Sequence, residues 1–228
     1  MELDNIITHL AQVQIRALPK EEQEFARILN LHLNLIHTQL ASFAAALCIL
    51  DYSLAVISNF SHPEHNYHSV PPQISSYYIP GSSLLHHELM FVAFRDAAMT
   101  VYHFWRSCQI VKDMLDKLNS FRTPAKSQIV DLVCRDLRAF VKAGDIRDSV
   151  AHTSDLLKSP SEAKKNAIKK PHVSKMGYFA SGHVINSAAG RTFVTTGFKG
   201  EVVTYDLTNE TLETLHKYAA RMYDGIKA

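Results

Sequence analysis

Stretches in which apolar residues recur every three or four positions dominate this sequence and restrict it to a helical fold. One such stripe runs from Leu29 to Phe43, and another runs from Leu85 to Leu118. Apolar residues at this spacing lie along one side of an α-helix, where they pack against other helices. We therefore predict a mainly α fold, a helical bundle with helices over residues 3–18, 20–59, 84–118, 124–143, 146–157 and 208–226.

The pattern changes near residue 176. Thr192–Thr196 and Val202–Tyr205 are rich in β-branched and aromatic residues, and glycines separate these runs. Such runs predict strands, and the glycines predict the turns between them. A sheet of this size is marginal alone, so we expect a small C-terminal antiparallel β-meander of two or three strands packed on the helices. Thr208 is expected to cap the final helix.

The sequence has 228 residues, which suits one large domain. We expect a single domain in which helices precede the sheet and one helix follows it. Its parts in order are N-terminal helices (1–60), a long loop (61–82), a helical core (83–157), a basic loop (158–175), the β-meander (176–206) and the C-terminal helix (207–228).

Composition gives no global signal for nucleic acid. The formal net charge is +2, so a basic surface would have to be local. Cys48, Cys108 and Cys134 lie far apart, which fits neither a disulfide framework nor a zinc site and predicts buried free thiols in a reducing compartment. Met1–Asp4 lacks the basic start and apolar run of a signal peptide, so the expected location is the cytoplasm.

One segment raises the question of a membrane. Leu40–Ile57 is largely apolar and has about the length of a short transmembrane helix. It also contains Asp51, Ser42 and Ser53, which are costly in a lipid environment. We interpret the segment as a buried core helix and expect no membrane partner, with a membrane span as the less favoured alternative.

Residues 61–82 are rich in proline, serine, histidine and tyrosine, which predicts a long loop. His62, His65 and His68 have a spacing that could ligate a metal ion, but no cysteine accompanies them. A mobile polar loop is the favoured interpretation, and a loop that covers a cleft or a partner surface is the alternative. We expect neither a metal nor another cofactor.

The stretch from Ile146 to His152 carries the strongest chemical signal. Asp148 and His152 are four positions apart on the expected helix, so the carboxylate can accept an imidazole N–H and favour the protonated ring. Arg147 offers a planar fork of donors that suits a phosphate, although it lies about 140° around the axis from His152. Gly144 interrupts the preceding helix, which places the stretch near a helix start that favours anions.

These three side chains suffice for phosphodiester cleavage in RNA without a metal. His152 would move a proton between the ribose 2′-hydroxyl and the leaving oxygen. Arg147 would stabilise charge on the phosphoryl oxygens. The expected products are a 2′,3′-cyclic phosphate and a 5′-hydroxyl end.

The pattern Arg147-Asp148-x3-His152 resembles the Arg-x4–6-His motif of the HEPN superfamily of small helical domains. The resemblance implies a helical fold, a metal-independent endoribonuclease of toxin or defence type, and a homodimer in which both copies of the motif line one cleft. It also implies RNA and a cognate antitoxin or other protein as partners. Two alternatives stay open, a non-catalytic HEPN-like nucleotide-binding or protein-interaction module and a structural helical protein in which the motif is incidental.

Two further groups of charged residues are candidates for supporting this site. Arg95 and Asp96 lie in an otherwise apolar helix, where inward charges need partners, so we assign them to a second layer around the motif. Five lysines follow between residues 158 and 170, and we assign Lys164 and Lys165 to contacts with the RNA backbone. A solvated loop or a frayed helix is the plainer interpretation of this lysine-rich segment.

Overall fold

The computed structural model describes residues 12–60, 84–141, 157–174, 177–184 and 187–227. Their contacts divide the chain into two compact units. The helical unit contains the described residues up to 43, those from 98 to 141 and those from 209 onwards. The mixed unit contains residues 44–60, 84–97 and the described part of 157–208. The chain is mainly α-helical with a small antiparallel C-terminal region and a final helix, as predicted.

The four long helices are those that the apolar stripes predict, and their ends differ from the expected ones by a few residues. They are α1 (Gln23–Phe60), α3 (Leu84–Leu115), α4 (Pro124–Val141) and α8 (Asn209–Lys227). The stripe of α1 is fully buried at every predicted position from Leu29 to Ile36 and is nearly so at Leu40. Burial of such a stripe, more than intrinsic helix propensity, stabilises helices of this length.

The expected helix over residues 3–18 is wrong in its described part. Residues 12–14 are not helical, and only a 3₁₀ turn, η3 (Ile15–Ala17), follows them. The side chain of Asn30 explains this, because its oxygen accepts from the Val13 backbone N–H at 2.9 Å and its NH₂ donates to the Val13 carbonyl at 3.0 Å. Both backbone groups that a helix would use at Val13 are therefore satisfied by another element.

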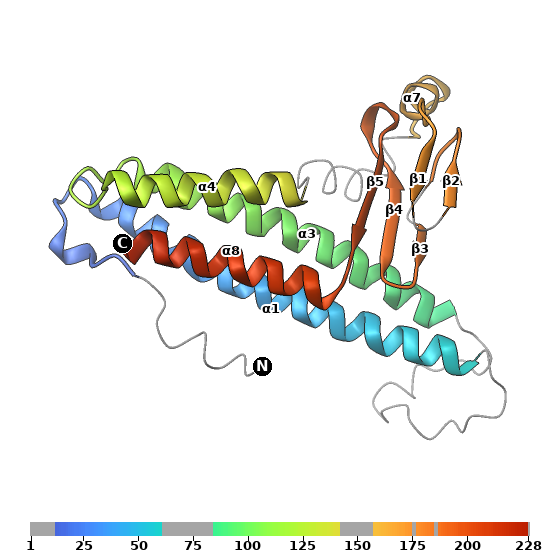
Figure 1. The fold of residues 1–228 in the computed structure, drawn as a ribbon, viewed down its shortest axis with the longest axis horizontal. Coiled ribbons are helices and arrows are strands. Elements are labelled where there is room, and N and C mark those ends of the chain that lie inside the picture. The colour runs from blue at the N-terminus through green and yellow to red at the C-terminus, as the bar shows by residue number, and fades with distance from the viewer. Residues whose placement is uncertain (1–11, 61–83, 142–156, 175–176, 185–186, 228) are drawn as a thin grey trace. The chain divides into compact units, whose positions relative to one another are not determined.

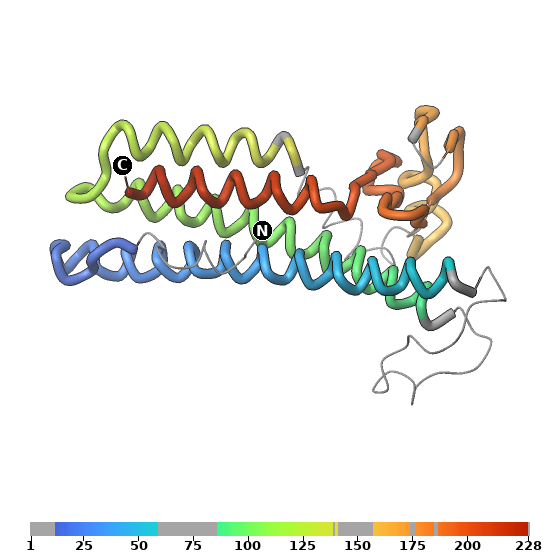
Figure 2. The backbone as a smooth tube through the Cα atoms, turned by 60° about the horizontal axis from the view of Figure 1, so that its bottom comes forward, coloured from blue at the N-terminus to red at the C-terminus, as the bar shows by residue number. Residues whose placement is uncertain are grey.

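In the helical unit, α4 and α8 run side by side in both views of the backbone (Figures 1 and 2). Gly225 of α8 permits a close approach, since a Cβ there would lie 2.9 Å from Cγ2 of Ile129. Two buried hydrogen bonds tie distant segments together: Tyr223 donates to the Leu33 carbonyl at 2.9 Å, and Lys126 donates to the Ile226 carbonyl at 3.2 Å. These contacts make the unit a helical bundle.

The cysteines agree only in part with the prediction of buried thiols. Cys108 and Cys134 are buried in the helical unit, and the Cys134 thiol donates to the Cys108 carbonyl at 3.4 Å. Burial raises the pKa of Cys134 to about 12 and also raises the pKa of Cys108. Cys48 is exposed, because Leu47 and Leu50 occupy the buried face of α1 at that level.

The predicted meander is a three-stranded antiparallel sheet in the order β3 (Ser187–Ala189), β4 (Thr192–Thr196) and β5 (Val202–Asp206) (Figure 1). Phe193 of β4 pairs with Tyr205 of β5, and their ring centroids are 5.4 Å apart. Phe94 of α3 packs against both rings, with centroids 5.5 Å from Phe193 and 6.0 Å from Tyr205. The sheet is thus anchored on a helix through an aromatic cluster, as its small size requires.

The expected loop over residues 158–175 is wrong. It contains the helix α7 (Pro160–Asn166) and the strand β1 (His172–Ser174), which pairs antiparallel with β2 (Gly177–Phe179). The whole of the expected loop over residues 61–82 and the motif at Arg147–His152 fall in the ranges 61–83 and 142–156, outside the described residues. The three histidines of that loop therefore stay sequence predictions.

Within the described ranges, α1 alone is long and apolar enough to cross a membrane, judged by its length and composition. Only 33% of its most apolar window is buried. Asp51 of α1 is paired with Arg191, and both belong to the mixed unit. The finding is weak evidence for a membrane segment, because the core helix of a soluble protein passes the same test.

Candidate nucleic-acid interface

The sequence-predicted site residues fall into three groups. Arg147, Asp148 and His152 lie outside the described residues. Lys164 and Lys165 are on α7, and Arg95 and Asp96 are on α3. The described chain therefore brings the two lysines together on one short helix.

Arg95 and Asp96 are exposed, so the expectation that these charges face inward is wrong. The inward face of α3 is occupied by Ala93, Phe94 and Ala97, all of which are fully buried. Successive helical residues are about 100° apart, so the two positions between Phe94 and Ala97 turn toward solvent. A supporting role for Arg95 and Asp96 around the motif stays a prediction.

The start of α7 is fixed by its own sequence. The Ser159 side chain accepts a hydrogen bond from the Glu162 backbone N–H at 3.2 Å, and Pro160 occupies the first turn. Serine followed three residues later by glutamate is a capping pattern, and proline suits the first helical position. Lys164 and Lys165 lie in the last turn, where positive charge is favoured by the helix dipole.

Three contacts hold α7 against the rest of the mixed unit. The buried Asn166 oxygen accepts from the Lys199 backbone N–H at 3.0 Å, and the His183 Nε2 donates to the Ala163 carbonyl at 2.8 Å. Gly200 has a φ of +80°, and a Cβ there would lie 2.0 Å from the Ala167 carbonyl oxygen. α7 is therefore a docked helix that presents its lysines from a defined position.

The β1–β2 hairpin has two different faces. Phe179 turns inward, where it packs on the buried cluster of Ile168, Val184 and Val194. Its neighbour Tyr178 turns outward and pairs across the hairpin with Val173. Val173 is 75% exposed and Tyr178 is 64% exposed, which makes them the two most exposed large hydrophobic residues that the structure describes.

Charge is unevenly distributed around these elements. The segment from residue 158 to residue 200, called the basic segment below, has one acidic residue, Glu162. Its eight basic residues are Lys158, Lys164, Lys165, Lys169, Lys170, Lys175, Arg191 and Lys199. Since the whole chain has a net charge of +2, the remainder has more acidic than basic residues.

Few of these basic side chains are neutralised by the protein itself. Between described residues, Lys165 pairs with Glu162 at 3.4 Å and Arg191 pairs with Asp51. The other described lysines of the segment are exposed and belong to no ion pair with a described residue. Such a local excess of lysine is the electrostatic requirement for binding phosphate groups.

A second polar cluster lies in the helical unit and is a weaker candidate. The Ser107 Oγ lies 3.4 Å from the His32 Nδ1 and donates to the Gln39 side chain at 3.5 Å. Burial and then the charge of Arg106 lower the pKa of His32. Ser107 is only 3% exposed, so its hydroxyl is out of reach of a large substrate. We interpret the cluster as a structural contact between α1 and α3.

No group of three or more histidine, cysteine or acidic side chains that could hold a metal ion occurs among the described residues. No protein-family model, no curated protein and no solved structure matches this chain. The comparisons therefore do not bear on the resemblance to the HEPN superfamily, which stays a prediction from the sequence.

The sequence singles out Lys164 and Lys165 as candidates but not Val173 and Tyr178, whose exposure is visible only in the structure. The signal for α7 was present, because Ser159-Pro160-Ser-Glu162 is a capping pattern that the lysines obscured. The signal for β1 was weak, since the strand has three residues and its only β-branched one is Val173.

Proposed function

We propose that this chain is a HEPN-like RNA-binding protein and a metal-independent endoribonuclease. One observation carries the proposal: the basic segment, with eight cations and one acid, begins six residues after His152. A cleavage motif and a phosphate-binding surface that adjoin in sequence suit a single nucleic-acid substrate. Lys164 and Lys165, on a docked helix, contact the RNA backbone in this proposal.

Lysine-rich surfaces bind RNA largely by electrostatics. Each phosphate contact releases counterions, so affinity falls as salt rises, with a slope of roughly 0.7 per contact for single strands. The exposed lysines of α7 and of the segment that follows it provide several such contacts. The same argument requires that the cations have no internal partner, and among described residues that holds for most of them.

The chemistry assigned to the motif is a transesterification. His152 removes the proton of the ribose 2′-hydroxyl, whose oxygen then forms a bond to the adjacent phosphorus. The bond from phosphorus to the 5′ oxygen breaks, and that oxygen takes up a proton from the protonated imidazole. Arg147 stabilises the charge on the non-bridging oxygens, and Asp148 orients His152. The products are a 2′,3′-cyclic phosphate and a 5′-hydroxyl.

A homodimer belongs to the same proposal. Arg147 and His152 are five positions apart, which would place them on different sides of the helix expected from the sequence. A twin chain lets the arginine of one protomer serve the histidine of the other. The protein partner that the resemblance implies, a cognate antitoxin or another protein, binds this dimer.

A non-catalytic RNA-binding module is the second candidate. The basic segment favours it, because the lysines and the hairpin account for binding without any contribution from Arg147 or His152. Cleavage and binding must therefore be measured separately.

The test uses purified protein and mixed RNA in EDTA. We expect cleavage with cyclic phosphate ends, at least about a hundredfold slower in His152→Ala because general acid–base catalysis contributes that much. His103→Ala is the matched control, since His103 is an exposed histidine of α3 with no role in the proposal. Equal cleavage by wild type and His152→Ala contradicts the nuclease assignment. Binding without cleavage establishes the second candidate, and neither activity removes both.

A further inference from the structure

The outer face of the β1–β2 hairpin is a surface that the fold itself does not use. The inner face of the hairpin packs against the core through Phe179. On the outer face, Val173 and Tyr178 lie directly opposite each other and leave most of their surface in water. Isolated exposed apolar residues are common, but a cross-strand pair exposed this far forms a patch that indicates a binding partner.

We propose that this face is a stacking platform for the bases of single-stranded RNA, with the Tyr178 ring beneath a base and Val173 beside it. This inference rests on the proposed RNA-binding function and specifies its substrate class. An aromatic ring stacks on any base, so the platform adds affinity without sequence preference. The lysines of the basic segment supply attraction for the phosphates.

Charge complementarity selects the occupant. The basic segment that contains the hairpin has eight cations and one acid, so the partner must be strongly anionic. RNA offers one negative charge per nucleotide together with flat apolar base faces, which match a lysine-rich surface with an exposed tyrosine. An apolar protein partner would leave the lysines without counterions.

The exposed ring also selects single-stranded over double-stranded RNA. In a duplex the bases are stacked on one another and present only their edges, so an aromatic side chain cannot cover a base face. Unpaired bases can be splayed out and stacked on a tyrosine. The position of Tyr178 in a strand, opposite Val173, sets the side of the hairpin from which its side chain projects.

The experiment measures binding of the full chain to a labelled 2′-O-methyl oligouridine by fluorescence anisotropy. This probe lacks the attacking hydroxyl and cannot be cleaved. Tyr178→Phe keeps the ring and should bind within about twofold of wild type, whereas Tyr178→Leu keeps apolar bulk without a flat ring and should bind about tenfold more weakly. Tyr218→Leu, at a half-buried tyrosine of α8, is the matched control and should bind normally.

The outcomes separate the inference from the function. If wild type binds and Tyr178→Leu binds equally well, the platform is wrong and the RNA-binding function stands. If wild type does not bind the probe, the function itself fails. Equal loss on a duplex probe contradicts the single-strand class. Binding to anionic vesicles is measured in parallel. If vesicle binding alone depends on Tyr178, the face is reassigned to a membrane surface. Tyr178→Thr, a good strand residue, replaces the leucine variant if that variant misfolds.

Discussion

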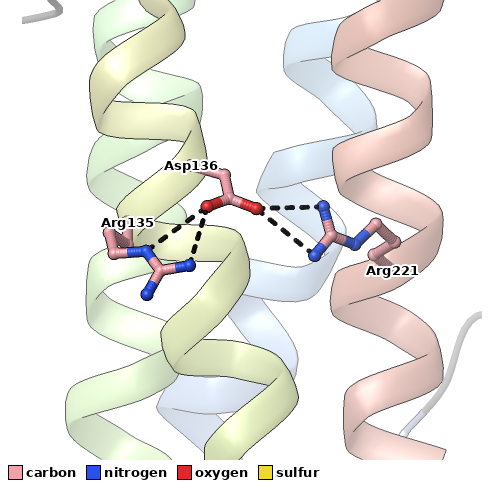
Figure 3. A network of polar contacts seen from close by, with 3 residues as sticks. All are labelled: Arg135, Asp136 and Arg221. Carbon is pink, nitrogen blue, oxygen red and sulfur yellow. Dashed lines mark hydrogen bonds and ion pairs between the residues drawn. The ribbon is translucent and has the colours of Figure 1, made fainter.

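The helical unit and the basic segment of the mixed unit both carry basic side chains, but they differ in how far acidic residues compensate the charge. On α4 and α8, Arg135 and Arg221 converge on the same carboxylate, that of Asp136, at 3.3 Å and 3.4 Å (Figure 3). Arg221 also lies over the Tyr218 ring, 5.9 Å from its centroid. The basic segment, by contrast, contains eight cations and one acidic residue, Glu162, whose ion-pair partner among the described residues is Lys165.

This contrast distinguishes basic side chains that are compensated within the protein from basic side chains that are available to a partner. Arginines that share an internal carboxylate have part of their donor capacity satisfied by the protein. Exposed lysines with little internal compensation keep a field that attracts anions from solution. The net charge of +2 hides this contrast, because the acids of the remaining chain offset the basic segment.

Removal of the lysine charges is expected to have the strongest effect on RNA binding. We expect the combined change of Lys164, Lys165, Lys169 and Lys170 to glutamine to weaken RNA binding by about a hundredfold at low salt and to lower the salt slope by roughly 0.7 per lost contact. The matched control changes Arg135, Arg138, Lys217 and Lys227 to glutamine, which removes the same charge from exposed positions of α4 and α8. Anisotropy titrations at several salt concentrations give both quantities, and equal losses in the two variants would erase the distinction between the surfaces.

The second prediction compares two glycines that differ in what a methyl group would meet. Gly200→Ala forces a carbon against the Ala167 carbonyl at a positive φ, so it should cost about 3 kcal/mol or more and release α7. Gly225→Ala meets the side chains of Ile129 and Val130 and no backbone atom among its three nearest neighbours, and a gain in helix propensity of about 1 kcal/mol offsets much of the cost.

Chemical denaturation measures both costs, and hydrogen exchange shows where protection is lost. We expect loss at the amides of α7 for Gly200→Ala, together with weaker RNA binding, and little change for Gly225→Ala. A Gly200→Ala protein with protected α7 amides would mean that the contact with Ala167 does not hold the lysines in place.

The smallest predicted change in RNA affinity concerns two acidic residues, Glu162 of the basic segment and Asp136 of the helical unit. Glu162→Gln removes the only acidic residue of the basic segment and frees Lys165, so RNA affinity should rise about twofold. Asp136→Asn removes the same charge from the arginine cluster and should leave RNA affinity unchanged, at a cost in stability of about 0.5 kcal/mol. The pair is measured in one titration series, and a rise with Asp136→Asn instead would show that the arginines also contact RNA.

The long helices could be predicted because their apolar stripes are long and regular, and the sheet because β-branched runs alternate with glycines. Arg95 and Asp96 show that the position of a residue around the helix axis decides whether it is buried, and that apolar neighbours in the sequence do not. Apolar residues surround them in the sequence, yet the buried side of α3 passes through Phe94 and Ala97.

The hairpin surface could not be predicted, for a different reason. Its two outer residues are separated by the turn and become a patch only when β1 and β2 pair. A three-residue strand leaves too few residues to establish a period of two. The docking of α7 likewise depends on a contact between Asn166 and Lys199, which are 33 positions apart in the sequence.

The helical unit begins near one end of the described chain and is completed only by α8. The hydrogen bond from Tyr223 to Leu33 joins residues 190 positions apart. A nascent chain emerging from the ribosome must therefore hold the apolar stripe of α1 without its final packing partner until α8 has been synthesised, 190 positions later. Such late closure slows folding and exposes apolar surface to chaperones and to other nascent chains.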